Sequence, residues 1–118
     1  MLAKYSELLV YKKAYNLVLE LYKFAKSMPE DEKYGLTSQI KRAVFGITIN
    51  IAEGYGKDDS KSELVRFLRM AKGSASELEV LLNICHDVGY MDDENYQTYF
   101  QENEDIQKML YGLIKSLN

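Results

Sequence analysis

The sequence predicts an all-α fold, an antiparallel up-down four-helix bundle that forms a single domain over residues 1–118. Three observations lead to this prediction. Apolar residues recur at helical spacing along four long segments. Short stretches that contain glycine, aspartate or proline separate these segments. No stretch shows the sustained alternation of a β-strand, and short connections between long helices favour antiparallel neighbours.

The first helix is expected over about residues 6–27. Its apolar residues form two adjacent heptad lines, which together make a face wider than a two-stranded coiled coil needs. The first line holds Val10, Ala14, Leu17, Leu21, Phe24 and Met28, and the second holds Leu8, Tyr11, Tyr15, Val18, Tyr22 and Ala25. Pro29 and the three acidic residues after it end this helix and open a connection.

The second helix is expected over about residues 37–54. One line of its residues is apolar and the neighbouring line is small, so another helix can approach closely. The apolar line is Ile40, Val44, Ile47 and Ile51, and the small line is Ala43, Gly46, Asn50 and Gly54. Gly46 lowers the helix propensity of the segment at the same time.

A turn over residues 54–59 precedes the third helix, which continues to Val88. Ser60 and Glu63 form a capping box, in which the serine accepts from a free amide and the glutamate reaches back. The main apolar line is Leu64, Leu68, Ala71, Ala75, Leu78, Leu82 and Cys85, and Phe67, Ser74, Leu81 and Val88 widen the face. Gly89 suits the position just past the helix end.

The fourth helix is expected to begin after Asp92, which can cap it. Asp93 and Glu94 suit the positive N-terminal end of its dipole. Its apolar line again steps by three and four residues: Tyr96, Tyr99, Asn103, Ile106, Leu110, Leu113 and Leu117.

Composition and charge narrow the class of protein. A single cysteine excludes an intrachain disulfide and fits a reducing compartment. We find no signal peptide and no run of apolar residues long enough to span a membrane, so we expect a cytoplasmic protein with no membrane partner. Residues 1–72 carry excess positive charge and residues 73–118 excess negative charge. This division indicates a polyanionic partner or charge-matched self-association, and unevenly placed solvated charges are the alternative.

Catalytic and metal-binding motifs are not found. A di-iron bundle needs Glu-x-x-His motifs, whereas this chain has one histidine, His86, with Asn83 three residues before it. Cys85 and His86 point about 100° apart on a helix and are poor joint ligands, so Cys85 is interpreted as a small core residue. Gly56 and Lys57 fail as a phosphate loop, because Ile51 occupies the position of the required glycine and a helix precedes the turn. We therefore expect no enzyme, no cofactor and no metal.

Two sets of polar residues remain as candidates. The first is interpreted as a structural polar network, with a ligand site between helices as the alternative. It consists of Arg42, Asn50, Glu53, Ser74 and Glu77. The second is a candidate nucleic-acid-binding surface, with a solvated face that meets acidic neighbours as the alternative. It consists of Lys41, Arg42, Lys57, Lys61, Arg66, Arg69 and Lys72.

Several stretches resemble the bacterial four-helix bundle proteins known as the 23S rRNA-intervening-sequence protein family. They are residues 29–43 (PEDEKYGLTSQIKRA), 50–54 (NIAEG), 67–74 (FLRMAKGS) and 77–79 (ELE). Three residues depart from the family pattern: Gly46 stands where serine is usual, Thr48 where proline is common and Tyr11 where tryptophan is common. The resemblance implies a closed ring of subunits, a homopentamer by preference. Accessory proteins of diversity-generating retroelements are similar in fold, bind nucleic acid on a positive surface and help a reverse transcriptase.

Physical arguments also favour a ring of subunits. Its interface needs two different, complementary faces on each subunit, and ten tyrosines suit such interfaces. The acidic fourth helix, through Glu102, Glu104 and Asp105, is expected to meet the basic flank of a neighbour. The leading prediction is a non-enzymatic homo-oligomer that presents a basic surface to RNA or DNA. The alternative is a protein-interaction scaffold that binds no nucleic acid.

Overall fold

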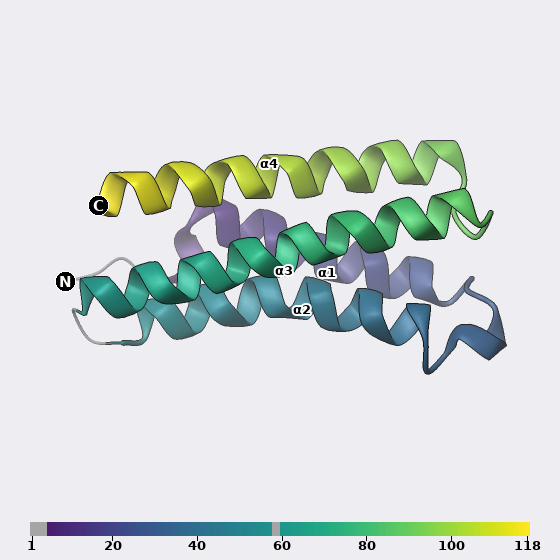
Figure 1. Ribbon diagram of the computed structural model, residues 1–118, viewed down its shortest axis with the longest axis horizontal. Helices are drawn as coiled ribbons and strands as arrows, with labels where there is room; N and C mark the ends of the chain where they lie inside the picture. Colours follow the sequence, from purple (N-terminus) through teal and green to yellow (C-terminus); the bar gives the residue numbers. More distant parts are fainter. Residues whose placement is uncertain (1–4, 58–59) are drawn as a thin grey trace.

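The computed structural model describes residues 5–57 and 60–118, which form four long helices joined by short turns (Figure 1). α1 spans Leu9–Ala25, α2 Leu36–Tyr55, α3 Lys61–Asp87 and α4 Asp93–Leu117. Short 3-10 turns, η1 (Tyr5–Glu7) and η2 (Glu30–Glu32), precede α1 and α2. Successive helices run in opposite directions along a body of 45 × 23 × 20 Å. The predicted up-down four-helix bundle is confirmed.

None of the helices in the described ranges is both long and apolar enough to cross a membrane.

Local side-chain signals set the helix ends. The predicted caps are confirmed, because Ser60 Oγ accepts from the Glu63 amide at 3.3 Å and Asp92 Oδ1 from the Asn95 amide at 2.8 Å. The second half of the predicted capping box was wrong. The Ser60 amide already donates to the Lys57 carbonyl at 3.1 Å, and the Glu63 carboxylate pairs with a residue of its own helix.

The end of α3 is a glycine-terminated Schellman turn. Gly89 has a φ of +90°, which an L side chain rarely adopts, and the Tyr90 amide donates to the Cys85 carbonyl at 3.0 Å. The predicted role of Gly89 is therefore confirmed. The prediction that Val88 widens the apolar face was wrong, because this residue follows the helix end and is 56% exposed. Met91, in the next turn, is buried at this end of the core instead.

The core follows the predicted heptad lines. All members of the apolar line of α2 and of the main line of α3 are buried. On α1 the first line is buried up to Phe24, whereas Tyr15 in the second line is half exposed. α4 adds Ile114, which the predicted line omitted, to its buried residues.

The seam between α2 and α3 is closely packed around two glycines. A Cβ atom added to Gly54 would lie 3.0 Å from Cβ of Phe67, and one added to Gly46 would lie 2.5 Å from Oγ of Ser74. The predicted close approach at the small residues of α2 is confirmed.

The seam between α1 and α4 has a different character. Lys13 Nζ lies 4.0 Å from Asp105 Oδ2, and the Phe24 and Tyr99 rings meet edge to face with centroids 5.9 Å apart. One carboxylate oxygen of Glu102 is buried here without a hydrogen-bond partner among the described residues. The α1–α4 seam therefore contains charged side chains as well as apolar ones.

Candidate nucleic-acid interface

The seven basic residues predicted to bind nucleic acid do not form one surface. Lys41 turns toward α1, where its ammonium lies 4.8 Å from the centre of the Tyr22 ring. Arg42 is exposed on α2, with its guanidinium 3.5 Å from the side-chain oxygen of Gln39. These two residues are therefore separate from the cations of α3.

A second group surrounds Phe67 at the start of α3. Lys57 Nζ lies 5.1 Å and Arg66 Cζ 4.6 Å from the centre of this ring. Arg66 also donates twice to Glu63, at 3.1 and 3.2 Å, and this hydrogen bonding lowers the pKa of the Glu63 carboxyl. The carboxylate of Glu63 thus offsets much of the positive charge of Arg66 within α3. Lys61, which is exposed, is also in the first turn of this helix.

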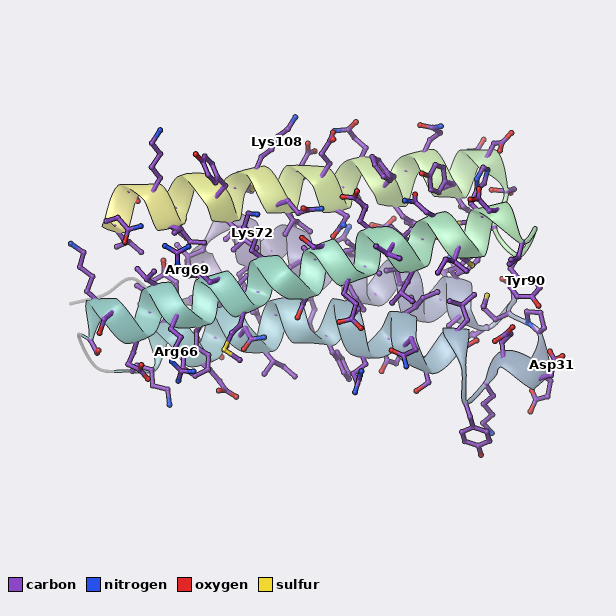
Figure 2. The ribbon with its side chains drawn as sticks, in the orientation of Figure 1. Asp31, Arg66, Arg69, Lys72, Tyr90 and Lys108 are labelled. Atoms are coloured by element: carbon purple, nitrogen blue, oxygen red, sulfur yellow. The ribbon has the colours of Figure 1, made fainter. Side chains whose placement is uncertain are left out.

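The third group lies on the edge of α3 that faces α4. Figure 2 shows Arg69 and Lys72 on this edge and Arg66 on the opposite edge, toward α2. Arg69, Lys72 and Lys115 line a hollow of about 350 Å³ together with Tyr111, Ile114 and Asn118. Within residues 5–57 and 60–118, no carboxylate lies within 4.0 Å of any of these three cations. Uncompensated positive charge therefore converges here from two helices.

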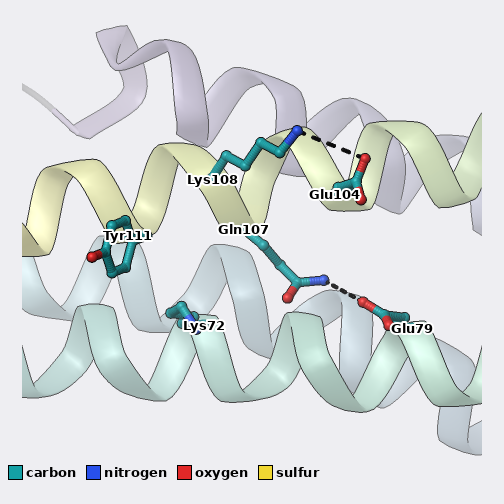
Figure 3. Close-up of a pocket in the computed structure, with 6 residues that line it drawn as sticks. All are labelled: Lys72, Glu79, Glu104, Gln107, Lys108 and Tyr111. Carbon is teal, nitrogen blue, oxygen red and sulfur yellow. Dashed lines mark hydrogen bonds and ion pairs between the residues drawn. The ribbon is translucent and has the colours of Figure 1, made fainter.

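A second hollow, of about 410 Å³, continues along the same groove and shares Lys72 and Tyr111 with the first (Figure 3). Its acidic residues are already engaged. Glu79 Oε1 accepts from Gln107 Nε2 at 3.0 Å, and Glu104 Oε1 lies 3.9 Å from Lys108 Nζ. The side chain of Tyr111, which is 57% exposed, lines both hollows.

The residues that α4 contributes were missed in the sequence. Lys108, Tyr111 and Lys115 follow one another at i, i+3 and i+7, a spacing that places all three on one helix face. This pattern was available as a signal. The net negative charge of the C-terminal region concealed it, because the acidic residues of α4 all precede Lys108.

The five residues predicted as a polar network are not joined by hydrogen bonds within the described part of the subunit. Arg42, Glu53 and Glu77 are exposed. Asn50 donates to the Gly46 carbonyl of its own helix at 2.8 Å. The small residues bring α2 and α3 too close for long polar side chains to enter between them. The buried polar contact lies elsewhere, where Asn103 Nδ2 donates to the Ala75 carbonyl at 2.8 Å.

Cys85 and His86 have separate structural environments. Burial raises the pKa of the Cys85 thiol to about 11, and its Sγ contacts Met28 Sδ at 3.7 Å. The His86 ring stacks on Tyr96 with centroids 4.3 Å apart, and a hydrogen bond with Asp93 raises its pKa. Among the residues described, no three His, Cys, Asp or Glu side chains are grouped to hold a metal ion.

The sequence profile of the 23S rRNA-intervening sequence protein family matches residues 6–112, which is most of the chain. The chain belongs to this family. No protein with a curated description matches it in sequence.

A solved structure of similar shape supports the fold of this 23S rRNA-intervening sequence protein. It is a crystal structure of a protein of unknown function from the S23 ribosomal protein family of Bacteroides thetaiotaomicron VPI-5482. The two chains superpose with a TM-score of 0.83 at 23% sequence identity, over 91% of this chain and 99% of the other. At this identity the likeness shows the fold alone.

The stretches that resemble the 23S rRNA-intervening sequence proteins meet in the structure. Residues 50–54 lie at the end of α2 and residues 67–74 in α3, and Gly54 packs directly against Phe67. The small and apolar members of both stretches therefore build the α2–α3 seam. Arg69 and Lys72 are the members that point away from this seam, toward α4.

Proposed function

We propose that this family member is a non-enzymatic protein that assembles with copies of itself and binds RNA or DNA through a basic surface. The observation that carries the proposal is the convergence of Arg69, Lys72 and Lys115 on one hollow without a carboxylate partner among the described residues. Phosphates that neutralise such cations release condensed counterions, which favours binding of a nucleic acid.

A separate group of cations lies at the start of α3. Lys57 and Lys61 lie at this end, where the amides at the N-terminus of the helix add partial positive charge. One copy of the surface makes few phosphate contacts. Several copies held in one assembly engage a single strand together, so that each contact raises the effective concentration for the next.

The acidic residues of α4 that were expected to meet a neighbouring subunit all have close contacts within their own subunit. Asp105 already pairs with Lys13, Glu104 with Lys108, and Glu102 faces Glu20 of α1. Asp105 and Glu104 already pair with lysines of the subunit, and Glu102 is partly buried, so these groups are poor candidates for a neighbour's basic flank.

Two exposed apolar faces are better suited to a second copy of the chain. One is on α1 and α2 and the other is on α3, and all their large side chains are 42–56% exposed. The first holds Tyr15, Leu19, Phe45 and Ile49, and the second holds Met70, Val80 and Ile84. In the first face, α1 also carries the exposed Lys23 and ends just before the exposed Lys26. The helix of the second face, α3, also carries the exposed acidic residues Glu77 and Asp87. Two different faces on each subunit are what a closed ring requires. The family resemblance implies a ring of five subunits.

Light scattering on mixed variants tests this assembly. Leu19→Glu and Val80→Glu each damage one of the two faces, so each variant alone is expected to be a monomer. Their mixture still contains one intact pair of faces and is expected to form a heterodimer. A wild-type chain that is monomeric at low and high salt contradicts the assembly.

Fluorescence anisotropy with labelled RNA and duplex DNA tests the nucleic-acid binding. Affinity is expected to fall steeply between about 50 and 200 mM salt, because counterion release weakens as salt rises. Replacement of Arg69, Lys72 and Lys115 together by glutamate is expected to abolish binding while the helical circular dichroism signal stays unchanged. If this variant still binds nucleic acid, the assignment of these basic residues as the binding surface is wrong.

The exposed apolar faces also favour a second function, a protein-interaction scaffold without nucleic-acid binding. The same titration separates the two functions. If the wild type binds no nucleic acid at either salt concentration, the basic residues serve solubility and the search turns to protein partners.

A further inference from the structure

We propose that the groove between α3 and α4 binds single-stranded nucleic acid, with an unpaired base stacked on Tyr111 and phosphates held by Arg69, Lys72 and Lys115. This inference rests on the proposed nucleic-acid binding. It adds the form of the nucleic acid and the place where the strand lies.

The first argument is the position of an exposed aromatic ring among cations. Tyr111 lines both hollows, with Lys108 and Lys115 about one helical turn away on either side. Proteins that bind single strands combine a positive groove with aromatic side chains on which bases stack. Each hollow falls within the range of ligand pockets, roughly 300–1,000 Å³.

The second argument is the unequal charge of the two hollows. The hollow at the C-terminal end of α4 is lined by three cationic side chains and by no Asp or Glu side chain, so it suits the phosphates. The other hollow contains Glu79 and Gln107, which hydrogen-bond each other through one oxygen and one N–H. The second carboxylate oxygen of Glu79 and the second amide N–H of Gln107 offer an acceptor and a donor to the edge of a base. A nucleotide whose ring lies on Tyr111 reaches both hollows at once.

The third argument is that stacking on Tyr111 requires a base with a free face. A paired base inside a duplex has both faces covered by its neighbours, so it cannot stack on Tyr111. A duplex therefore contacts the cations of the groove alone, whereas a single strand contacts the cations and the ring. The geometry favours the strand whose bases are free.

The experiment compares variants of Tyr111 on two ligands in fluorescence anisotropy. The ligands are a labelled RNA strand of about 12 nucleotides and the same strand in a duplex. Tyr111→Ser is expected to weaken binding of the single strand about tenfold or more and to change duplex binding less than about twofold. Tyr111→Phe keeps the ring and is expected to bind like the wild type. Tyr34→Ser is the matched control, because Tyr34 is 89% exposed and lies before α2, outside the groove.

A second measurement reports on the ring directly. The chain contains no tryptophan, so Tyr111→Trp introduces a single fluorescent probe into the groove. Stacking is expected to quench this probe when the single strand binds, whereas inorganic polyphosphate, which has no bases, is expected to leave it unquenched.

The outcomes separate this inference from the proposed function. If Tyr111→Ser binds the single strand as tightly as the wild type while the basic variants lose affinity, the stacking site is overturned and the basic surface stands. Preference of the wild type for the duplex, or an unquenched probe on the bound single strand, likewise overturns the site alone. Absence of binding to either ligand at low salt overturns both.

Discussion

The α2–α3 seam and the α1–α4 seam hold the same bundle together by different means. At the first, Gly54 and Gly46 bring two helices so close that a single added carbon would meet Phe67 or Ser74. At the second, the charged side chains of Lys13 and Asp105 meet across the gap between the helices. A seam made of small residues fixes the register of its helices by shape. A seam that contains charged side chains is adaptable, and its strength depends on pH.

Glu102 makes the second seam sensitive to pH. Burial, and then the neighbouring carboxyl group of Glu20, raise the pKa of its carboxyl to about 7, although the charge of Lys13 acts in the opposite direction. Because this pKa lies above the usual 4.5, the contribution of Glu102 to stability is fully present below about pH 4.5. That contribution is lost as the pH rises through 7 and the carboxylate becomes charged in a partly buried site.

The largest effect is expected from a bulky residue in the tight seam. Gly54→Val places branched carbons against Phe67 and Leu64, and overpacking of this kind destabilises a fold by about 1–3 kcal/mol. Gly73→Ala is the control, because nothing lies within 4 Å of its added carbon. It is expected to stabilise the helix by up to about 1 kcal/mol. Urea unfolding at one fixed protein concentration measures both, and equal stability of the two variants would contradict the description of the seam.

An intermediate effect is expected at the polar seam. Glu102→Gln removes the buried charge and is expected to stabilise the chain by about 1 kcal/mol at pH 8, with little change at pH 4. Urea unfolding across this pH range should therefore show a flatter dependence on pH for the variant than for the wild type. Glu104→Gln, two residues along and paired with Lys108, is expected to retain the wild-type slope. Identical slopes for Glu102→Gln and the wild type would show that Glu102 does not couple the seam to pH.

The smallest effect is expected from the ion pair that spans the polar seam. Lys13 and Asp105 are partly exposed and 4.0 Å apart, so Lys13→Met is expected to change stability by less than about 0.5 kcal/mol at pH 7. Loss of this positive charge should nevertheless raise the pKa of Glu102 further and shift the pH-dependent step in stability upward. Lys12→Met, on the exposed side of α1, serves as the control. A step that stays at the same pH in both variants would exclude Lys13 as a neighbour of Glu102.

The sequence predicted only part of the grouping of the basic residues, for a physical reason. Arg69 and Lys72 were identified because they lie on one helix at a readable spacing, but Lys41 and Arg42 were assigned to the same surface and lie apart from it. Tyr111 and Lys115 were missed, although they line the same groove as Arg69. Helical periodicity says which residues share a face of one helix, and it does not say which face of another helix lies opposite.

The sequence by itself determined the four helices, their caps at Ser60 and Asp92, the turn at Gly89 and most of the core. These features depend on interactions between residues a few positions apart and on the burial of one apolar face, so a local pattern is enough to predict them. Only the tertiary structure decided that Glu102 faces Glu20 and that the cations of α3 and α4 share a groove with Tyr111. These features depend on how each helix is rotated against its neighbours, which the packing of all four helices sets together.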